Sequence, residues 1–139
     1  MSVVKNKRTQ GDLQVLNLSK NPLSHTMTKC KNETLFPKRQ RWLLCNRLIN
    51  ASLEIVTNVR EANAILVQTR FDYMLRREHQ NKAHAELNSM YNLLEVALDF
   101  TPLSPSELEY WCTMVKETDD ALKHWMRSDA DRYKDIRTD

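Results

Sequence analysis

The sequence contains two clusters of basic side chains whose type and spacing are suited to binding an anionic ligand. Each cluster lies at the expected start of a helix. The clusters are Lys38, Arg39, Arg41 and Arg47, and Arg70, Arg76, Arg77 and Lys82. Lysine and arginine bind a polyphosphate backbone mainly by electrostatic contacts that do not depend on base sequence. The pattern therefore predicts nucleic-acid binding, with an ordinary solvated helix face as the alternative interpretation.

The charge of the chain is divided along its length. Residues 1–82 contain 15 Lys and Arg against 6 Asp and Glu, whereas residues 83–139 contain 6 against 12. This division indicates separate basic and acidic surfaces behind a net charge of only +3. Aromatic side chains beside the basic clusters are few, with Tyr73 the one expected there, so we expect contacts to the backbone rather than base stacking.

Other kinds of site find little support in the sequence. Paired inward carboxylates with Glu-x-x-His motifs, as in metal-binding helical bundles, are lacking. The single glycine, Gly11, gives no phosphate-binding loop. Cys30, Cys45 and Cys112 are odd in number and widely spaced, which is typical of small buried side chains with free thiols. We therefore expect no catalytic activity, no metal and no cofactor.

The composition predicts an all-helical single domain. The chain has 139 residues, one Gly and four Pro, which is too little turn chemistry for a sheet protein of this length. It also lacks a long apolar run and the pattern of a secretory signal, so we expect a cytoplasmic protein without membrane contact.

Four amphipathic helices with short connections are expected to form an antiparallel up-down-up-down bundle. The first begins near Asp12 and is interrupted at Asn21, because Pro22 follows. The second spans about Pro37–Leu66, and the chain reverses within Val67–Asp72. The third ends before Pro102, and Ser104 to Glu107 form a capping box that begins the fourth. Residues 1–11 are expected to be a flexible basic segment, 12–128 the bundle and 129–139 a polar tail.

The second helix carries two apolar stripes. The first stripe is Leu44, Leu48, Ala51, Ile55, Val59 and Ala62, which share one helical face. The second is Trp42, Ile49, Leu53 and Val56. A helix with two stripes needs cover on both sides, so the second stripe predicts a homo-oligomer with Trp42 as its anchor. Trp111 and Trp125 fall on core stripes and are expected to be buried.

A resemblance to a known family is carried by residues 36–63. The sequence Phe36-Pro37-Lys38, an aromatic residue, and then a spaced set of side chains resembles the second helix of small bacterial four-helix-bundle proteins. That set is Leu44, Arg47, Ala51, Ile55, Asn58 and Glu61. The group includes the ribosomal-RNA intervening-sequence proteins and the accessory variability determinant of diversity-generating retroelements. The residues Ala62 and Asn63 stand where the intervening-sequence branch usually has a glycine, so the second branch is the better match.

The resemblance implies a function as well as a fold. It implies a pentameric, non-catalytic partner of a reverse transcriptase that binds template RNA or cDNA and supports mutagenic retrohoming. It implies no small-molecule substrate. The alternative is a structural or assembly module of the intervening-sequence type with no specific nucleic-acid partner.

Overall fold

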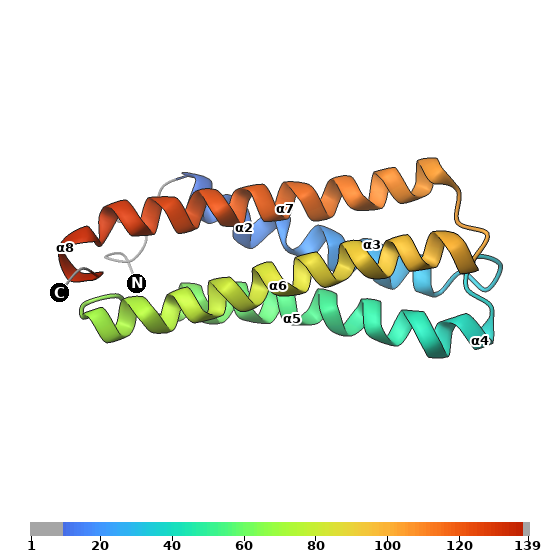
Figure 1. The fold of residues 1–139 in the computed structure, drawn as a ribbon, viewed down its shortest axis with the longest axis horizontal. Helices are drawn as coiled ribbons and strands as arrows, with labels where there is room; N and C mark the ends of the chain where they lie inside the picture. Colours follow the sequence, from blue (N-terminus) through green and yellow to red (C-terminus); the bar gives the residue numbers. More distant parts are fainter. Residues whose placement is uncertain (1–9, 138–139) are drawn as a thin grey trace.

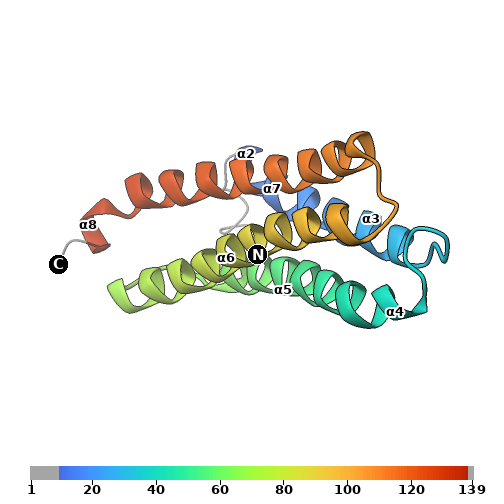
Figure 2. The same ribbon diagram turned by 45° about the vertical axis from the view of Figure 1, so that its right-hand side comes forward.

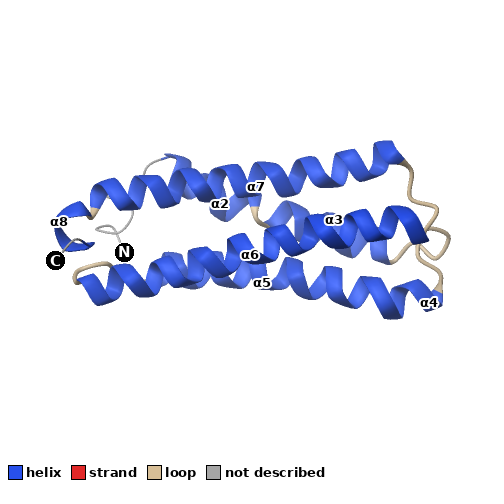
Figure 3. Cartoon of the chain, in the orientation of Figure 1, coloured by secondary structure: helices blue, strands red, loops and turns tan. Residues whose placement is uncertain are grey.

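The computed structural model describes residues 10–137, and this part of the chain is all-helical, as predicted (Figure 3). The elements are α2 (Gln10–Leu18), α3 (Lys20–Cys30), α4 (Lys38–Gln40), the π-helical turn η1 (Arg41–Cys45), α5 (Asn46–Ala64), α6 (Arg70–Phe100), α7 (Pro105–Arg132) and α8 (Lys134–Arg137). None of the helices in residues 10–137 has the length and apolar character needed to cross a membrane.

The long helices lie side by side along the long axis of the molecule (Figures 1 and 2). Helix α6 packs against both α5 and α7, α2 packs mainly against α7, and α3 contacts α5 and α7. The shared core contains all six residues of the first stripe of the second helix, from Leu44 to Ala62. Trp111 and Trp125 are also buried there, at 0% and 2% exposure. The predicted core face of the second helix is therefore confirmed.

The interruption of the first helix lies at Ser19, between α2 and α3, rather than at Asn21. Pro22 has no backbone N–H, so the carbonyl of Leu18 loses its partner four residues along the helix. The hydroxyl of Thr118 on α7 lies 3.1 Å from the Leu18 carbonyl and 2.9 Å from the Met114 carbonyl of its own helix, and can donate to either. The helix begins at Gln10, and residues 1–9 of the predicted flexible segment lie outside the described residues.

The second helix extends from Lys38 to Ala64 through α4, η1 and α5, close to its predicted limits. The π-helical turn was not expected. A π turn uses more residues than an α turn, so it rotates the residues before it relative to those after it. Trp42 lies inside this turn. The stripe that joins Trp42 to Ile49 and Leu53 in a regular helix is consequently broken.

The chain reverses over residues 65–69 without glycine or proline. The guanidinium group of Arg76 on α6 donates to the carbonyl of Ala62 at 3.1 Å and to the carbonyl of Ile65, where α5 ends. Thr69 and Asp72 then form a capping box at the start of α6. A buried side chain thus satisfies carbonyls that a helix end otherwise leaves open, which explains the reversal.

The start of α7 agrees with the sequence prediction, and its end does not. Ser104 is the N-cap and forms the expected capping box with Glu107, and Pro105 occupies the first turn. The helix continues to Arg132, and Asp129 is fully buried. Helix α7 therefore extends four residues beyond the predicted end of the bundle at residue 128, and its core stripe reaches Asp129.

Candidate nucleic-acid interface

The α4 end of the molecule is positioned by the loop that precedes it. The side-chain oxygen of Asn32 accepts hydrogen bonds from the backbone N–H groups of Thr34 at 3.0 Å and Leu35 at 3.1 Å. Phe36 is buried and packs edge-on against Trp111, with ring centroids 6.3 Å apart. These contacts fix the chain just before Pro37, so the following basic residues lie on a firmly anchored helix start.

The first predicted group of basic residues, which we call the α4 basic cluster, consists of Lys38, Arg39, Arg41 and Arg47. Lys38, Arg39 and Arg47 are exposed, and Arg41 is half-buried. None of the four forms an ion pair with a carboxylate of residues 10–137. The Nε atom of Arg41 is buried and has no hydrogen-bond partner within the same residues. This cluster is therefore uncompensated positive charge.

The second predicted group behaves differently. Arg70 is exposed, but Lys82 pairs with Glu78 at 3.5 Å. Arg77 is half-buried and donates to the Tyr73 hydroxyl at 2.7 Å and to the carbonyl of Met126 on α7 at 2.8 Å. Arg77 thus serves mainly to join α6 to α7.

Arg76 is not a surface residue. It is 5% exposed, and its guanidinium group contacts the carboxylate of Asp129 and the end of α5. The prediction that Arg76 belongs to a phosphate-binding surface is corrected by this burial, because a guanidinium group held in the core does not reach a ligand. The sequence did contain a signal, since Asp129 follows Leu122 and Trp125 at core spacing.

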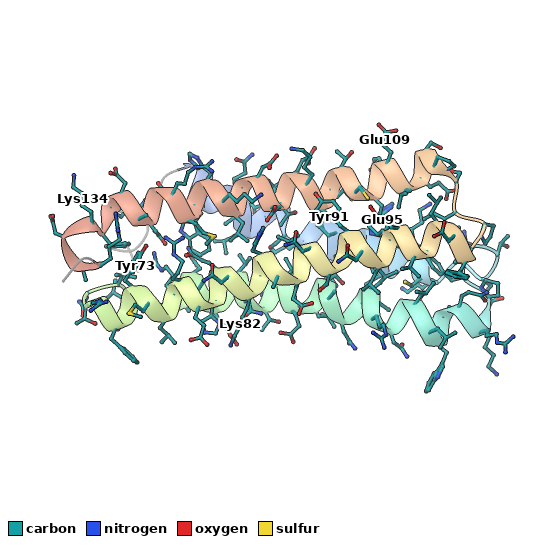
Figure 4. The ribbon with its side chains drawn as sticks, viewed as in Figure 1. Tyr73, Lys82, Tyr91, Glu95, Glu109 and Lys134 are labelled. Carbon is teal, nitrogen blue, oxygen red and sulfur yellow. The ribbon has the colours of Figure 1, made fainter. Side chains whose placement is uncertain are left out.

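The two groups lie at opposite ends of the molecule. Figure 1 shows α4 at one end and the start of α6 at the other. In Figure 4, Tyr73 lies near the α8 end, and Lys82 lies further along α6. Of the eight predicted residues, the structure brings Lys38, Arg39 and Arg41 together around one surface hollow. Arg47 lines a separate hollow that also includes Glu54 and Glu86. This end of the molecule is consequently the stronger candidate surface.

The second apolar stripe is only partly available to another subunit. Val56 is buried at 9% exposure, and Ile49 is partly buried against the chain's own core. Trp42 and Leu53 remain exposed. The four residues therefore do not form one continuous outer stripe, because the chain itself covers two of them.

Trp42, and not Tyr73, is the aromatic residue that lies beside the unpaired side chains of the α4 basic cluster. It lines one surface hollow together with Lys38, Arg39 and Arg41. Tyr73, the aromatic residue expected beside a basic cluster, is half-buried, with the Arg77 guanidinium 5.4 Å from the centre of its ring. The adjacency of Trp42 to these cations is visible in the sequence itself, at residues 38–42.

The three cysteines are free thiols, as expected. Cys30 and Cys45 are buried, whereas Cys112 is half-buried. Burial raises the pKa of all three thiols, so they are weak nucleophiles near neutral pH. Within residues 10–137, no group of three or more His, Cys, Asp or Glu side chains is arranged to hold a metal ion.

Comparison of the chain with models of protein families, with curated proteins and with solved structures finds no match. A functional assignment therefore depends on the α4 basic cluster and on the residue pattern of positions 36–63.

Proposed function

We propose that this protein is a non-catalytic, nucleic-acid-binding helical-bundle protein. The observation that carries the proposal is the α4 basic cluster, four cationic side chains without a carboxylate partner among the described residues. Unpaired Lys and Arg on one surface are the electrostatic requirement for binding a phosphate backbone. The end of α6 and the start of α7 lie at the same end of the molecule as α4 (Figure 1). The described carboxylates of these helices form no ion pair with the α4 basic cluster.

We further propose a four-helix, up-down-up-down architecture in which α2 and α3 count as one interrupted helix. The packing of α6 between α5 and α7, and of α2 and α3 beside them, supports this arrangement. Such bundles have a polar outer surface on which binding residues are carried by rigid helices.

The biological setting we propose is that of an accessory protein of a diversity-generating retroelement. In this setting the protein binds template RNA or cDNA and the reverse transcriptase, and it supports mutagenic retrohoming. The support is the pattern from Phe36 to Asn63, including Arg47, which belongs both to the pattern and to the α4 basic cluster.

Self-association, pentameric by resemblance, is also part of the proposal, but the surface differs from the second stripe. Large exposed apolar side chains lie on one face of α6, near its two ends. They are Phe71, Met74, Val96 and Phe100. Exposed apolar side chains that share one helical face are favourable for contact with another copy.

Light scattering tests this surface. The double substitution Phe71→Ser and Phe100→Ser should lower the particle mass, whereas Tyr110→Ser, which alters an exposed aromatic residue of α7, should not. A wild-type protein that is monomeric at working concentrations would contradict self-association.

Nucleic-acid binding is tested by measuring the affinity for a labelled RNA at low and rising salt. The double reversal Lys38→Glu and Arg39→Glu should abolish most of the binding. The matched control, Lys20→Glu and Arg60→Glu, changes net charge equally at exposed positions outside the cluster. Equal losses in both variants would show that only net charge matters. The absence of binding at low salt in the wild type would favour the alternative, an assembly module without a nucleic-acid partner.

A further inference from the structure

Trp42 is the most exposed large hydrophobic residue of the described chain, and its surroundings are cationic. Its exposure is 76%, while Trp111 and Trp125 are buried. The same hollow is lined by Lys38, Arg39, Arg41, Leu43 and Asn46. Trp42 and Leu43 are thus adjacent exposed apolar side chains, and the three cations that line the same hollow have no carboxylate partner within residues 10–137.

The π-helical turn sets the position of Trp42. Trp42 and Leu43 are exposed in this turn, whereas Leu44 and Cys45 point into the core. The side-chain Nδ2 of Asn46, the first residue of α5, donates to the Trp42 carbonyl at 3.4 Å. Isolated π turns occur frequently at functional sites, because they redirect side chains without ending the helix.

The cations around Trp42 favour one ligand class over a protein partner. The cores of protein interfaces are depleted in charged residues, and burying Lys38, Arg39 and Arg41 against an apolar surface would leave their charges unpaired. A nucleotide fits both the aromatic and the cationic side chains of the hollow. Its base offers a flat apolar face to Trp42, and its phosphate is an anion that pairs with the basic side chains. Aromatic residues beside basic side chains recognise unpaired bases in this way.

We infer that the hollow at η1 binds an unpaired nucleotide of a single-stranded nucleic acid, with its base stacked on Trp42 and its phosphates beside Lys38, Arg39 and Arg41. This inference rests on the proposed nucleic-acid-binding function and adds the form of the ligand. Single strands are preferred over duplexes, because the bases of a duplex are already stacked on one another. Trp42 is then a ligand contact rather than the anchor between subunits.

Intrinsic fluorescence provides a specific test, since Trp42 is the exposed tryptophan among three. Titration with an oligouridylate should quench the long-wavelength emission of the wild type. The duplex of the same strand with oligoadenylate should quench it much less. Trp42→Ala should abolish this quenching and weaken oligouridylate binding by about 5- to 150-fold. Trp42→Phe should retain most of the affinity, because it keeps an aromatic face, and Leu43→Ala should have a small effect.

The outcomes separate this inference from the proposal beneath it. Salt-dependent binding with unchanged Trp42 emission, and equal affinity in Trp42→Ala, would overturn stacking and leave the proposed function intact. No binding of either RNA would overturn both. A reduced particle mass of Trp42→Ala in light scattering, with unaltered RNA affinity, would assign Trp42 to the subunit contact and overturn the inference.

Discussion

The guanidinium group of Arg76 on α6 faces the carboxylate of Asp129 on α7, with Nη1 at 3.2 Å from both carboxylate oxygens. The two side chains are 6% and 0% exposed, so the ion pair lies in the core. Gln80 also donates to this carboxylate, at 3.0 Å. Because Arg76 caps the end of α5 as well, one side chain connects three helices.

Removal of the Asp129 carboxylate is expected to destabilise the fold strongly. Asp129→Ala leaves the buried Arg76 guanidinium without its counterion, and breaking such a pair costs about 3–5 kcal/mol. Urea unfolding followed by circular dichroism measures the loss. Asp131→Ala, at an exposed position two residues away, is the matched control and should change the free energy of unfolding little. Equal stability of the two variants would contradict the role of the pair.

The hydrogen bond between Trp111 and Thr26 gives a second prediction for stability. The indole N–H of Trp111 on α7 donates to the Thr26 hydroxyl on α3 at 3.2 Å, and both residues are fully buried. Thr26→Val keeps the shape but removes the acceptor, so the free energy of unfolding should fall by about 1–3 kcal/mol. Thr26→Ser keeps the acceptor and should retain part of that stability. Urea unfolding followed by circular dichroism measures both variants. A valine variant more stable than the serine variant would show that packing, rather than the hydrogen bond, dominates.

Acid should weaken the two helix starts that use capping boxes. The hydrogen bond from the Gln68 N–H lowers the pKa of Asp72, and the one from the Ser104 N–H lowers the pKa of Glu107. A carboxyl whose pKa is lower in the folded state adds stability above its unfolded pKa of about 4, and this stability is lost as the pH falls through the folded pKa.

The comparison of wild type with Glu107→Gln isolates one of these groups. Glutamine still accepts the capping hydrogen bond but does not titrate, so the urea midpoint of the variant should fall less between about pH 5 and pH 3. Burial raises the pKa of Asp129 in both proteins, so its contribution cancels in the difference. Identical pH dependence of the two proteins would exclude a contribution from Glu107.

The salt dependence of RNA affinity should report how many phosphate contacts the α4 basic cluster makes. Removing one phosphate contact to a single strand reduces the slope of log affinity against log salt by about 0.7. Arg39→Gln should therefore flatten this slope, while Arg60→Gln on the same long helix should not. The slope is measured by fluorescence anisotropy over a series of salt concentrations, and an unchanged slope for Arg39→Gln would remove that residue from the interface.

The sequence alone determined that the chain forms amphipathic helices and which face of these helices is buried in the core. The spacing from Leu44 to Ala62, the burial of Trp111 and Trp125, and the capping box of Ser104 and Glu107 all agree with the structure. These features depend on periodicity and on neighbours within one turn, so they are present in the local sequence. The capping box of Thr69 and Asp72 is visible in the sequence in the same way, because its two residues lie within one turn.

Tertiary structure alone decided which charged side chains are buried in ion pairs and which are exposed and unpaired. Arg76 and Arg39 look alike in sequence, yet one is buried against Asp129, 53 positions away, and the other is exposed and unpaired. Likewise, Val56 is covered by the chain itself, while Trp42 remains exposed. Helical periodicity states which residues share a face of one helix. Which charges and apolar faces are compensated depends on the helices that pack beside them, and that packing brings together residues far apart in the chain.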